Sequence, residues 1–341
     1  MAEGETDIDA AWEEAFYWSN YVYLPAGEWQ ASSLTLAANK WLLTDGAATI
    51  IQQKSGLAAG TRLIKITGSG ARLAPGSAIT LRGNIALDTG EQNHGIFIRG
   101  TADIADIVVG DVVAEDIRGD AIYVGGTASA RVDNLTIGNV TGSNILRSVI
   151  SVTGGESVDI GAIEAAGAVG YMMLNIEPDG SSQLCKSISV GDIIGGRVGV
   201  IGQTAANFVE FVTIASLNLD PAHTPNSDPP YSAFGNIEAT GLWLRNCRTV
   251  TIGSHRSRDF ADHAVKYVFN GGEMVGDDIT ISTIDWANCN WGETTYNTQA
   301  NILNTDTVTF GGGAVALPAG AGKRLYAASL TGVDASNVTV S

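Results

Sequence analysis

The chain has 341 residues, of which 45% are hydrophobic, so it can bury a core and is not intrinsically disordered. A formal net charge of −17 argues against nucleic acid as a partner, because phosphate binding needs clustered Lys and Arg. No apolar run is long enough to insert into a membrane, and the N-terminus MAEGETDIDAAWEE lacks the basic segment and apolar core of a secretory signal.

The first predicted element is a capping helix in residues 6–18, TDIDAAWEEAFYW, with Thr6 as its N-cap. Such a helix suits a solenoid, whose open end exposes unpaired strand edges that must be covered. The segments 21–29, 35–46 and 48–53 follow as the first strands. The apolar residues that share one face of the helix are Ile8, Ala11, Trp12, Ala15 and Phe16.

A unit of the form x-apolar-x-apolar-small recurs nine times, for example as DIVVG (106–110) and TVTIG (249–253). The average spacing of about 29 residues is typical of a solenoid, in which each repeat is one rung of a stack. The leading apolar residues of the nine units are Ile107, Leu135, Val158, Ile188, Val212, Val250, Ile279, Val308 and Val338.

Each rung carries a second apolar pair upstream, and a third short strand fits the stretches 112–117 and 255–260. We therefore expect an all-β fold, a single-stranded right-handed parallel β-helix, with its handedness set by the crossover rule. Residues 1–20 would form the capping helix and lead-in, and residues 21–341 one β-helix domain. The upstream pairs are Ile96/Ile98, Ile122/Val124, Ile150/Val152, Leu174/Ile176, Val198/Val200, Leu242/Leu244, Val265/Tyr267 and Ala300/Ile302.

Three cysteines do not predict a disulfide or a metal site. Cys185 and Cys247 each stand three residues before the leading apolar residue of a rung, in a core column, and two rungs apart, which is about 10 Å. Cys289 is the third. The Pro-rich and Asn-rich segment 219–236 is expected to project from one face and to border a binding surface.

Four segments, YLPAGEW (23–29), LLTDGAATIIQQ (42–53), GDAIYV (119–124) and GLWLRNCRTVTIG (241–253), make the chain resemble the pectate-lyase-like β-helix superfamily. This superfamily contains pectate lyases, polygalacturonase-type hydrolases, uronan epimerases and phage tailspike depolymerases, and the opening YLPAGEW is most similar to the last. The resemblance implies a bacterial cell-surface or extracellular polysaccharide as ligand, an extracellular or virion-associated location, and a homotrimer. The N-x-D, D-D and D-P-H-E catalytic motifs of the superfamily are missing, so no catalytic set carries over.

The outward column of the upstream strand mixes aromatic, amide and basic groups, which suits a wall that stacks on sugar rings and binds their hydroxyls. An ordinary solvated sheet face is the alternative interpretation. This column consists of Phe97, Tyr123, Ser151, Asn175, Gly199, Trp243, Lys266 and Asn301.

Two regions concentrate ionisable residues at the turn that enters this strand. Residues 115–124 align with residues 258–267, so that Asp116 matches Asp259 and Asp120 matches His263. Turn formation is the alternative role of Asp116 and Asp259. The predicted catalytic residues are Asp120, Glu177, Asp259, Asp262 and His263, and the predicted substrate-binding residues are His94, Tyr123, Trp243, Arg245, Arg258 and Lys266.

The predicted function is an endo-acting polysaccharide depolymerase, a glycoside hydrolase of the tailspike type, and two alternatives remain open. The hydrolase would use two carboxylates, about 5 to 5.5 Å apart for retention or about 6.5 to 9.5 Å for inversion. Asp120 with Glu177 could supply the longer spacing, and Asp259 with Asp262 is the other candidate pair.

A polysaccharide lyase would use the basic and His cluster of residues 245–266. A carbohydrate-binding β-helix without activity is the other alternative. No cofactor is predicted, and Asp277 beside Asp278 is only a weak signal for calcium.

Overall fold

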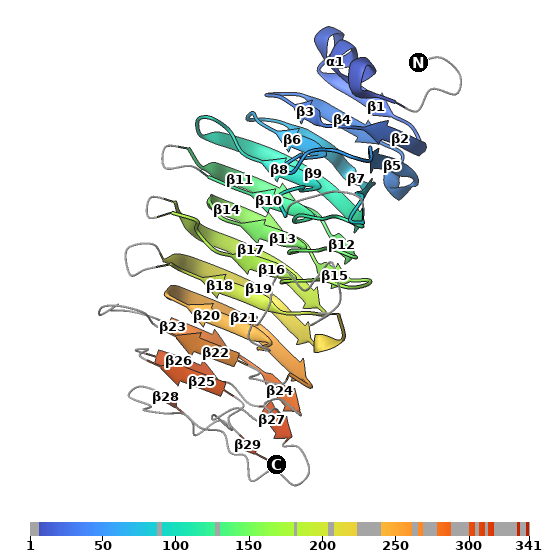
Figure 1. Ribbon diagram of the computed structural model, residues 1–341. Coiled ribbons are helices and arrows are strands. Elements are labelled where there is room, and N and C mark those ends of the chain that lie inside the picture. The colour runs from blue at the N-terminus through green and yellow to red at the C-terminus, as the bar shows by residue number, and fades with distance from the viewer. Residues whose placement is uncertain are drawn as a thin grey trace.

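The computed structural model shows a stack of parallel strands capped by a helix (Figure 1). It describes residues 7–86, 91–126, 130–180, 183–203, 208–223, 240–260, 265–268, 278–287, 300–303, 307–310, 313–316, 333–334 and 339–340. In this part of the chain, no helix has the length and apolar character needed to cross a membrane.

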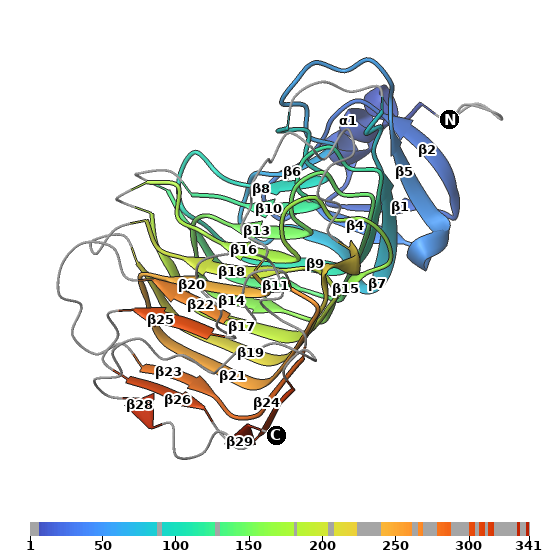
Figure 2. The same ribbon diagram turned by 60° about the horizontal axis from the view of Figure 1, so that its bottom comes forward.

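Each coil contributes strands to three walls, which Figure 2 shows from the C-terminal end. We call the first wall sheet B. Its strands pair in parallel along the stack in the order β3 (Leu34–Leu36), β6 (Ile64–Ile66), β8 (Ile96–Ile98), β10 (Ile122–Val124), β13 (Ile150–Val152), β16 (Leu174–Ile176), β18 (Val198–Ile201), β20 (Leu242–Arg245), β22 (Val265–Val268) and β25 (Ala300–Leu303).

The other two walls form one continuous parallel sheet, because several long strands run through both. The strands shared by the two walls are β7 (Arg72–Arg82), β9 (Ile104–Glu115), β17 (Cys185–Ile194), β19 (Val209–Leu219) and β21 (Cys247–Arg258). The second wall adds β1 (Tyr21–Leu24), β4 (Trp41–Thr44), β11 (Val132–Ile137), β14 (Gly155–Ile160), β23 (Asp278–Ile281), β26 (Thr307–Phe310) and β28 (Val333–Asp334). The third wall adds β2 (Gly27–Ala31), β5 (Thr49–Gln53), β12 (Val140–Ser143), β15 (Ile163–Ala165), β24 (Ile284–Ala287), β27 (Gly313–Ala316) and β29 (Thr339–Val340).

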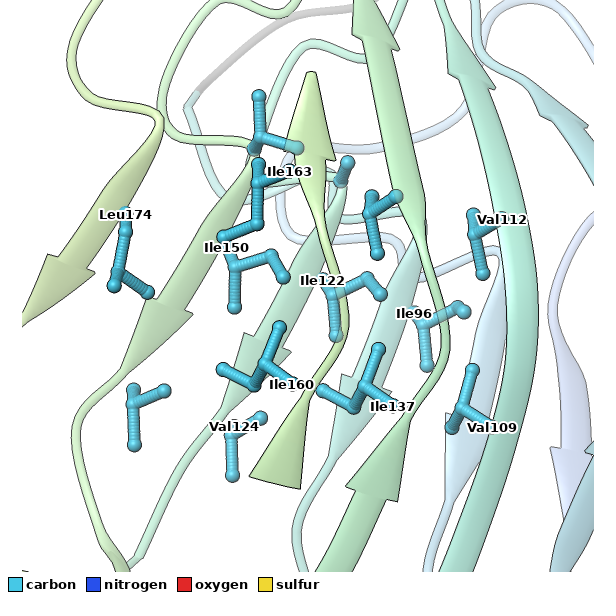
Figure 3. Close-up of a cluster of buried hydrophobic side chains, with 14 of the residues drawn as sticks. Ile96, Val109, Val112, Ile122, Val124, Ile137, Ile150, Ile160, Ile163 and Leu174 are labelled. Carbon is cyan, nitrogen blue, oxygen red and sulfur yellow. The ribbon is translucent and has the colours of Figure 1, made fainter. Parts of the chain in front are cut away.

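The fold is the right-handed parallel β-helix that the repeat predicts, and the predicted register is confirmed. Ile96, Ile122, Ile150 and Leu174 are paired in successive rungs of sheet B and stack inside the coil (Figure 3). The core is therefore built from columns of like side chains, since matching residues of neighbouring rungs lie about 4.8 Å apart. The predicted third strand exists, but in β9 and β21 it continues from the second-wall strand without a break.

Left-handed backbone recurs just before the leading apolar residue of the rung. Asp106, Asn134 and Ser187 have φ values of 59°, 49° and 55°. The Asn134 side-chain amide also donates a 2.6 Å hydrogen bond to the Asp106 carboxylate one rung away. Asn and Asp tolerate this conformation better than most residues, so the turn chemistry agrees with the repeat.

The capping helix is α1 (Asp9–Trp18), which covers the N-terminal end of the stack. Its predicted face is confirmed in part, because Ile8, Trp12 and Phe16 are buried. The predicted N-cap, Thr6, lies outside the described residues, and Ile8 at the N-cap position makes no side-chain cap hydrogen bond. The Asp7 carboxylate instead accepts a 3.1 Å hydrogen bond from the Asp9 backbone N–H.

Cys185 and Cys247 are both fully buried free thiols, as predicted. Both pair with Val209 in the rung between them, which places them two rungs apart in one core column. Cys289 lies outside the described residues, and so do residues 224–236 of the predicted insertion. The described part of that insertion contains the short 3-10 helix η2 (Pro221–His223). A second 3-10 helix, η1 (Gly46–Ala48), precedes β5.

Candidate functional site

The predicted outward column of sheet B lies on one face, in register from rung to rung. Phe97 pairs with Tyr123, Tyr123 with Ser151, and Ser151 with Asn175. The column then continues through Gly199 and ends in Trp243, Lys266 and Asn301. From Phe97 to Trp243, where the side chains are described, the column alternates with the inward apolar pairs and faces away from the core.

The alternative interpretation of this column, an ordinary solvated sheet face, is wrong for its middle part. Tyr123, Ser151 and Asn175 are each at most 7% exposed, although they point away from the core. Alternation along a strand shows which way a side chain points but not whether other segments cover it. We use the name polar wall for Asp120, Tyr123, Arg147, Ser148, Ser151 and Asn175, which are the buried or half-buried polar residues of this face and of the turns that enter it.

Asp120 and His94, two of the predicted site residues, are neighbours at the turns that enter β10 and β8. His94 Nδ1 accepts a 3.0 Å hydrogen bond from the Asp120 backbone N–H and lies 3.3 Å from the Asp120 carboxylate. Asp120 also accepts a 3.0 Å hydrogen bond from the Ser148 N–H, and Arg147 Nε lies 3.5 Å from the same carboxylate oxygen.

The charge of Asp120 is balanced within this cluster. Burial would raise the pKa of its carboxyl, but the Arg147 guanidinium, the His94 ring and the Ser148 N–H together outweigh burial and hold that pKa below its usual value. Asp120 is therefore an ionised, paired carboxylate with no exposed surface. These properties suit a residue that orients its neighbours better than one that exchanges protons with a substrate.

An aromatic stack lies beside this cluster. Phe97 and Tyr123 are nearly parallel, with ring centroids 5.2 Å apart, and His94 stacks on Tyr123 at 4.9 Å. The Arg62 guanidinium covers Phe97 at 4.7 Å from its centroid. Offset stacking and a cation above a ring both stabilise such a row and fix the orientation of Tyr123.

Tyr123 links the polar wall to the accessible edge of sheet B. Its hydroxyl donates a 2.8 Å hydrogen bond to the Asp179 carboxylate and accepts one of 2.8 Å from the Thr153 hydroxyl. Burial raises the pKa of Tyr123 above its usual range, and the Asp179 charge adds to this effect. Tyr123 therefore stays protonated and holds the exposed Asp179 in place.

Glu177 and Arg245 lie at the same edge and belong to one network. The Glu177 carboxylate accepts hydrogen bonds of 3.2 Å from Asn175 and 2.5 Å from Gln203, and it lies 3.9 Å from Arg245 Nη2. Arg245 also stands over the Trp243 ring. The side chains of Glu177 and Arg245 remain 22% and 18% exposed. We call Glu177, Asp179, Gln203 and Arg245 the carboxylate edge.

The predicted inverting pair of Asp120 and Glu177 is wrong. They are two rungs apart as expected, but Glu177 is level with Gly125, five residues further along the strand direction than Asp120. At about 3.3 Å per residue and about 4.8 Å per rung, their Cα atoms lie about 19 Å apart. The side chains do not close this gap, because the Asp120 carboxylate contacts His94 and Arg147 whereas Glu177 turns along the stack to Gln203 and Arg245. The about 6.5 to 9.5 Å between the carboxyl groups of an inverting pair is therefore not reached.

Within the predicted basic cluster of residues 245–266, the two described arginines, Arg245 and Arg258, do not meet. Arg258 ends the third-wall strand β21 and bonds to Asp285 of the next rung through both its carboxylate and its backbone carbonyl, whereas Arg245 belongs to the carboxylate edge. Asp259 has a φ of 59° and Asp116 one of 56°, which agrees with their alternative role as turn residues. Asp262, His263 and the Lys266 side chain lie outside the described residues.

Several residues of this site were not predicted. Arg147 and Ser148 occupy the same turn as Asp120 one rung later, so the rung alignment contains the signal that would have found them. Asp179 follows Glu177 by two residues and lies beyond the end of β16, outside the strand positions that the rung alignment compares. Within the described residues no group of His, Cys, Asp and Glu could hold a metal ion; Asp277 and the Asp278 side chain lie outside them.

Buried polar atoms without a hydrogen-bond partner gather in the polar wall. They are Asp120 Oδ2, Arg147 Nε, Ser148 Oγ, Ser151 Oγ and Asn175 Oδ1. Asp120 Oδ2 lies 3.3 Å from His94 Nδ1, and Arg147 Nε lies 3.5 Å from the other Asp120 oxygen, so these two atoms have ionic neighbours. The Ser148 and Ser151 hydroxyls and Asn175 Oδ1 are buried without a hydrogen bond, which costs about 1 to 3 kcal/mol for each atom.

No protein-family model matches the sequence, and no curated protein matches it. The fold does match solved structures. The A-module of the Azotobacter vinelandii mannuronan C-5 epimerase AlgE4 aligns with 99% of this chain and 97% of its own length, at 15% identity and a TM-score of 0.53. The catalytic domain of a GH87 alpha-1,3-glucanase in complex with nigerose covers 100% of this chain and 67% of its own, at 13% identity and a TM-score of 0.47. The likeness to the A-module, at 15% identity, shows the parallel β-helix fold that the sequence resemblance implies.

Proposed function

We propose that this protein is a polysaccharide-acting enzyme whose substrate lies against sheet B, over the carboxylate edge. The observation that carries the proposal is the carboxylate edge itself, where the accessible carboxylates of Glu177 and Asp179 are held by Gln203 and by Tyr123 beside the Arg245 guanidinium. The matched A-module belongs to a mannuronan C-5 epimerase, and we propose the same broad substrate class, a polysaccharide, for this chain. A bacterial surface polymer and an extracellular or virion-associated location complete the proposal.

Hydrolysis is the reaction that the site supports best. Glu177 and Asp179 are the carboxylates of the edge. Glu177 accepts a hydrogen bond from Gln203, which is later in the stack, and Asp179 accepts one from Tyr123, which is earlier in the stack. A sugar linkage between them would meet one carboxyl group on each side, which is the arrangement that general acid and base catalysis of glycoside cleavage requires. Asn175 and Tyr123 would orient the two carboxylates.

Elimination from a uronate polymer is the second candidate, and the arginines favour it. Arg147 and Arg245 could neutralise a substrate carboxylate, as lyase chemistry requires. The base is the weaker part of this account. The candidate base is Tyr171, which interacts electrostatically with Arg147 and Arg245. Burial, with the charge of Glu177, raises the pKa of Tyr171 to about 12, whereas an efficient base has a pKa near the working pH.

The two reactions leave different products. We suggest incubating the protein with a panel of neutral and acidic bacterial polysaccharides and following reducing ends together with the ultraviolet absorbance of unsaturated uronates. New reducing ends without that absorbance are expected for the hydrolase. Both signals rising together would identify a lyase, and silence over the whole panel, with binding retained, would contradict an enzymatic function.

A further inference from the structure

The N-terminal end of the molecule exposes aromatic rings that its fold does not use. Tyr17 and Trp18, at the end of α1, are 79% and 77% exposed, and Tyr21 and Tyr23 of β1 are more than half exposed. Together with Trp41 of β4 we call them the aromatic patch. Large aromatic side chains normally bury most of their area, so this many exposed rings in one place require an explanation.

Pairing of the first two rungs makes the patch continuous. Tyr21 of β1 is paired with Trp41 of β4, and their ring centroids lie 5.1 Å apart. Tyr17 and Trp18 are in contact at 4.9 Å. The Lys40 ammonium ties the helix end to this rung through the Phe16 carbonyl and the Asn20 side chain. Figure 1 shows α1, β1 and β4 together at the N-terminal end of the stack.

The same column of the second wall carries no aromatic residue in the later described rungs and is polar there except at Val108. The residues in register with Tyr21 and Trp41 in these rungs are Arg72, Val108, Thr136, Asp159, Ser189, Thr213 and Thr251. From Tyr21 to Thr251, aromatic rings therefore occupy this column at the two rungs nearest the N-terminus. The repeat itself does not require them, because the later rungs form the same wall without them.

The exposed area fits a protein interface. Aromatic side chains present about 150 to 250 Å² each, so the rings of the patch expose about 600 Å². This is the upper end of what isolated monomers show and most of the about 800 Å² that each partner buries in a standard interface.

The rings of Tyr21 and Trp41 meet at 66°, and those of Tyr17 and Trp18 at 90°. They therefore form no flat platform on which a sugar could stack.

A neighbouring cavity adds a place for a partner's side chain. Tyr23 of the patch also lines an apolar cavity of about 330 Å³ between α1 and the first rungs. Its other walls include Ala11, Ala15, Val22 and Leu42. An apolar hollow beside exposed rings is self-complementary, since a copy of the same surface supplies both the ring and the hollow.

We propose that the aromatic patch is a self-association surface, through which two copies of this chain pair N-terminal end to N-terminal end about a two-fold axis. The pairing is independent of the proposed function, because the patch lies on α1 and the second wall whereas the carboxylate edge lies on sheet B. Each copy carries a net charge of −17, so the copies repel one another and the apolar contact must overcome this repulsion. Added salt should therefore strengthen the pairing.

Sedimentation equilibrium of the full chain without any polysaccharide tests the pairing directly. The natural protein should show the mass of two chains at micromolar concentration, and raising the salt should tighten it. The double variant Trp18→Ser, Tyr21→Ser should weaken association at least 10-fold. The matched control is Phe211→Ser, which removes an exposed ring elsewhere on the second wall, and it should leave the association unchanged.

Circular dichroism would show that the variants are folded, and Tyr17→Lys at an exposed helix position is a second variant should the double one fail to fold. A monomeric natural protein would overturn the proposal. So would a mass of three chains, or association that survives in the patch variants. Loss of polysaccharide binding in a patch variant of a monomeric protein would assign the patch to sugar instead.

Discussion

The buried hydroxyl of Tyr123 donates a 2.8 Å hydrogen bond to the exposed carboxylate of Asp179, 56 residues later in the chain. The bond reaches across two rungs, from β10 to the end of β16. It connects the covered polar wall with the accessible carboxylate edge. The position of Asp179 therefore depends on a residue that no substrate needs to touch.

Replacing Tyr123 by Phe should lower activity by about 10-fold to 100-fold through Asp179, while leaving the fold intact. The measurement is kcat for the natural and variant proteins, together with denaturant unfolding of both. An unchanged kcat with only reduced stability would show that Tyr123 has a structural role alone.

Asp120→Asn should destabilise the protein by about 3 kcal/mol at neutral pH, because it leaves Arg147 without its charge partner. The folded-state pKa of Asp120 lies below the unfolded value of 3.8, so its contribution is present above that pH and is lost as the pH falls through the folded-state pKa. Denaturant unfolding at pH 7 and at low pH measures both effects. Asp159→Asn, on the exposed second wall, is the control and should change little.

His255, buried in the third wall beside Ser257, should make the fold acid-sensitive. Burial lowers its pKa to about 3, so between about pH 6.5 and pH 3 the unfolded chain binds a proton that the folded chain does not. The free energy of unfolding should therefore decrease as the pH is lowered through this window, by up to about 1.4 kcal/mol per pH unit. His255→Leu should flatten this slope between pH 7 and pH 4.5. Equal slopes in both proteins would contradict the assignment.

Cys185 and Cys247 should not react with a thiol reagent until the protein unfolds. Both thiols are buried, and burial raises the pKa of Cys185 well above its usual range, which suppresses the reactive thiolate. The experiment uses a Cys289→Ser background, so that only these two thiols are counted. Rapid labelling of either one in the native state would show that its core column opens.

Much of the fold could be predicted because the repeat fixes which residues are neighbours. Aligning the rungs placed Ile122 beside Ile150 and put both cysteines in one core column, and pairing confirms each of these placements. This works because a column position experiences the same environment in every rung. Turn chemistry agreed as well, since Asp116 and Asp259 share a left-handed backbone.

The site was predicted less well, for two physical reasons. Rung counting gives separation along the stack but ignores position along the strand, so Asp120 and Glu177 looked closer than the register allows. Alternation gives the direction of a side chain but not what covers it, so Ser151 was expected in solvent and is buried. Residues such as Asp179, which lie beyond the ends of the strands, have no column from which to infer their partners.

The most direct test of the catalytic account is the rate of reducing-end release by Glu177→Gln, measured on a polysaccharide that the natural protein cleaves. The matched control is Glu164→Gln, an exposed carboxylate of the third wall. We expect kcat to fall by about 100-fold to 10,000-fold in Glu177→Gln and to remain unchanged in the control. Full activity in a folded Glu177→Gln variant would contradict the placement of the active site at the carboxylate edge of sheet B.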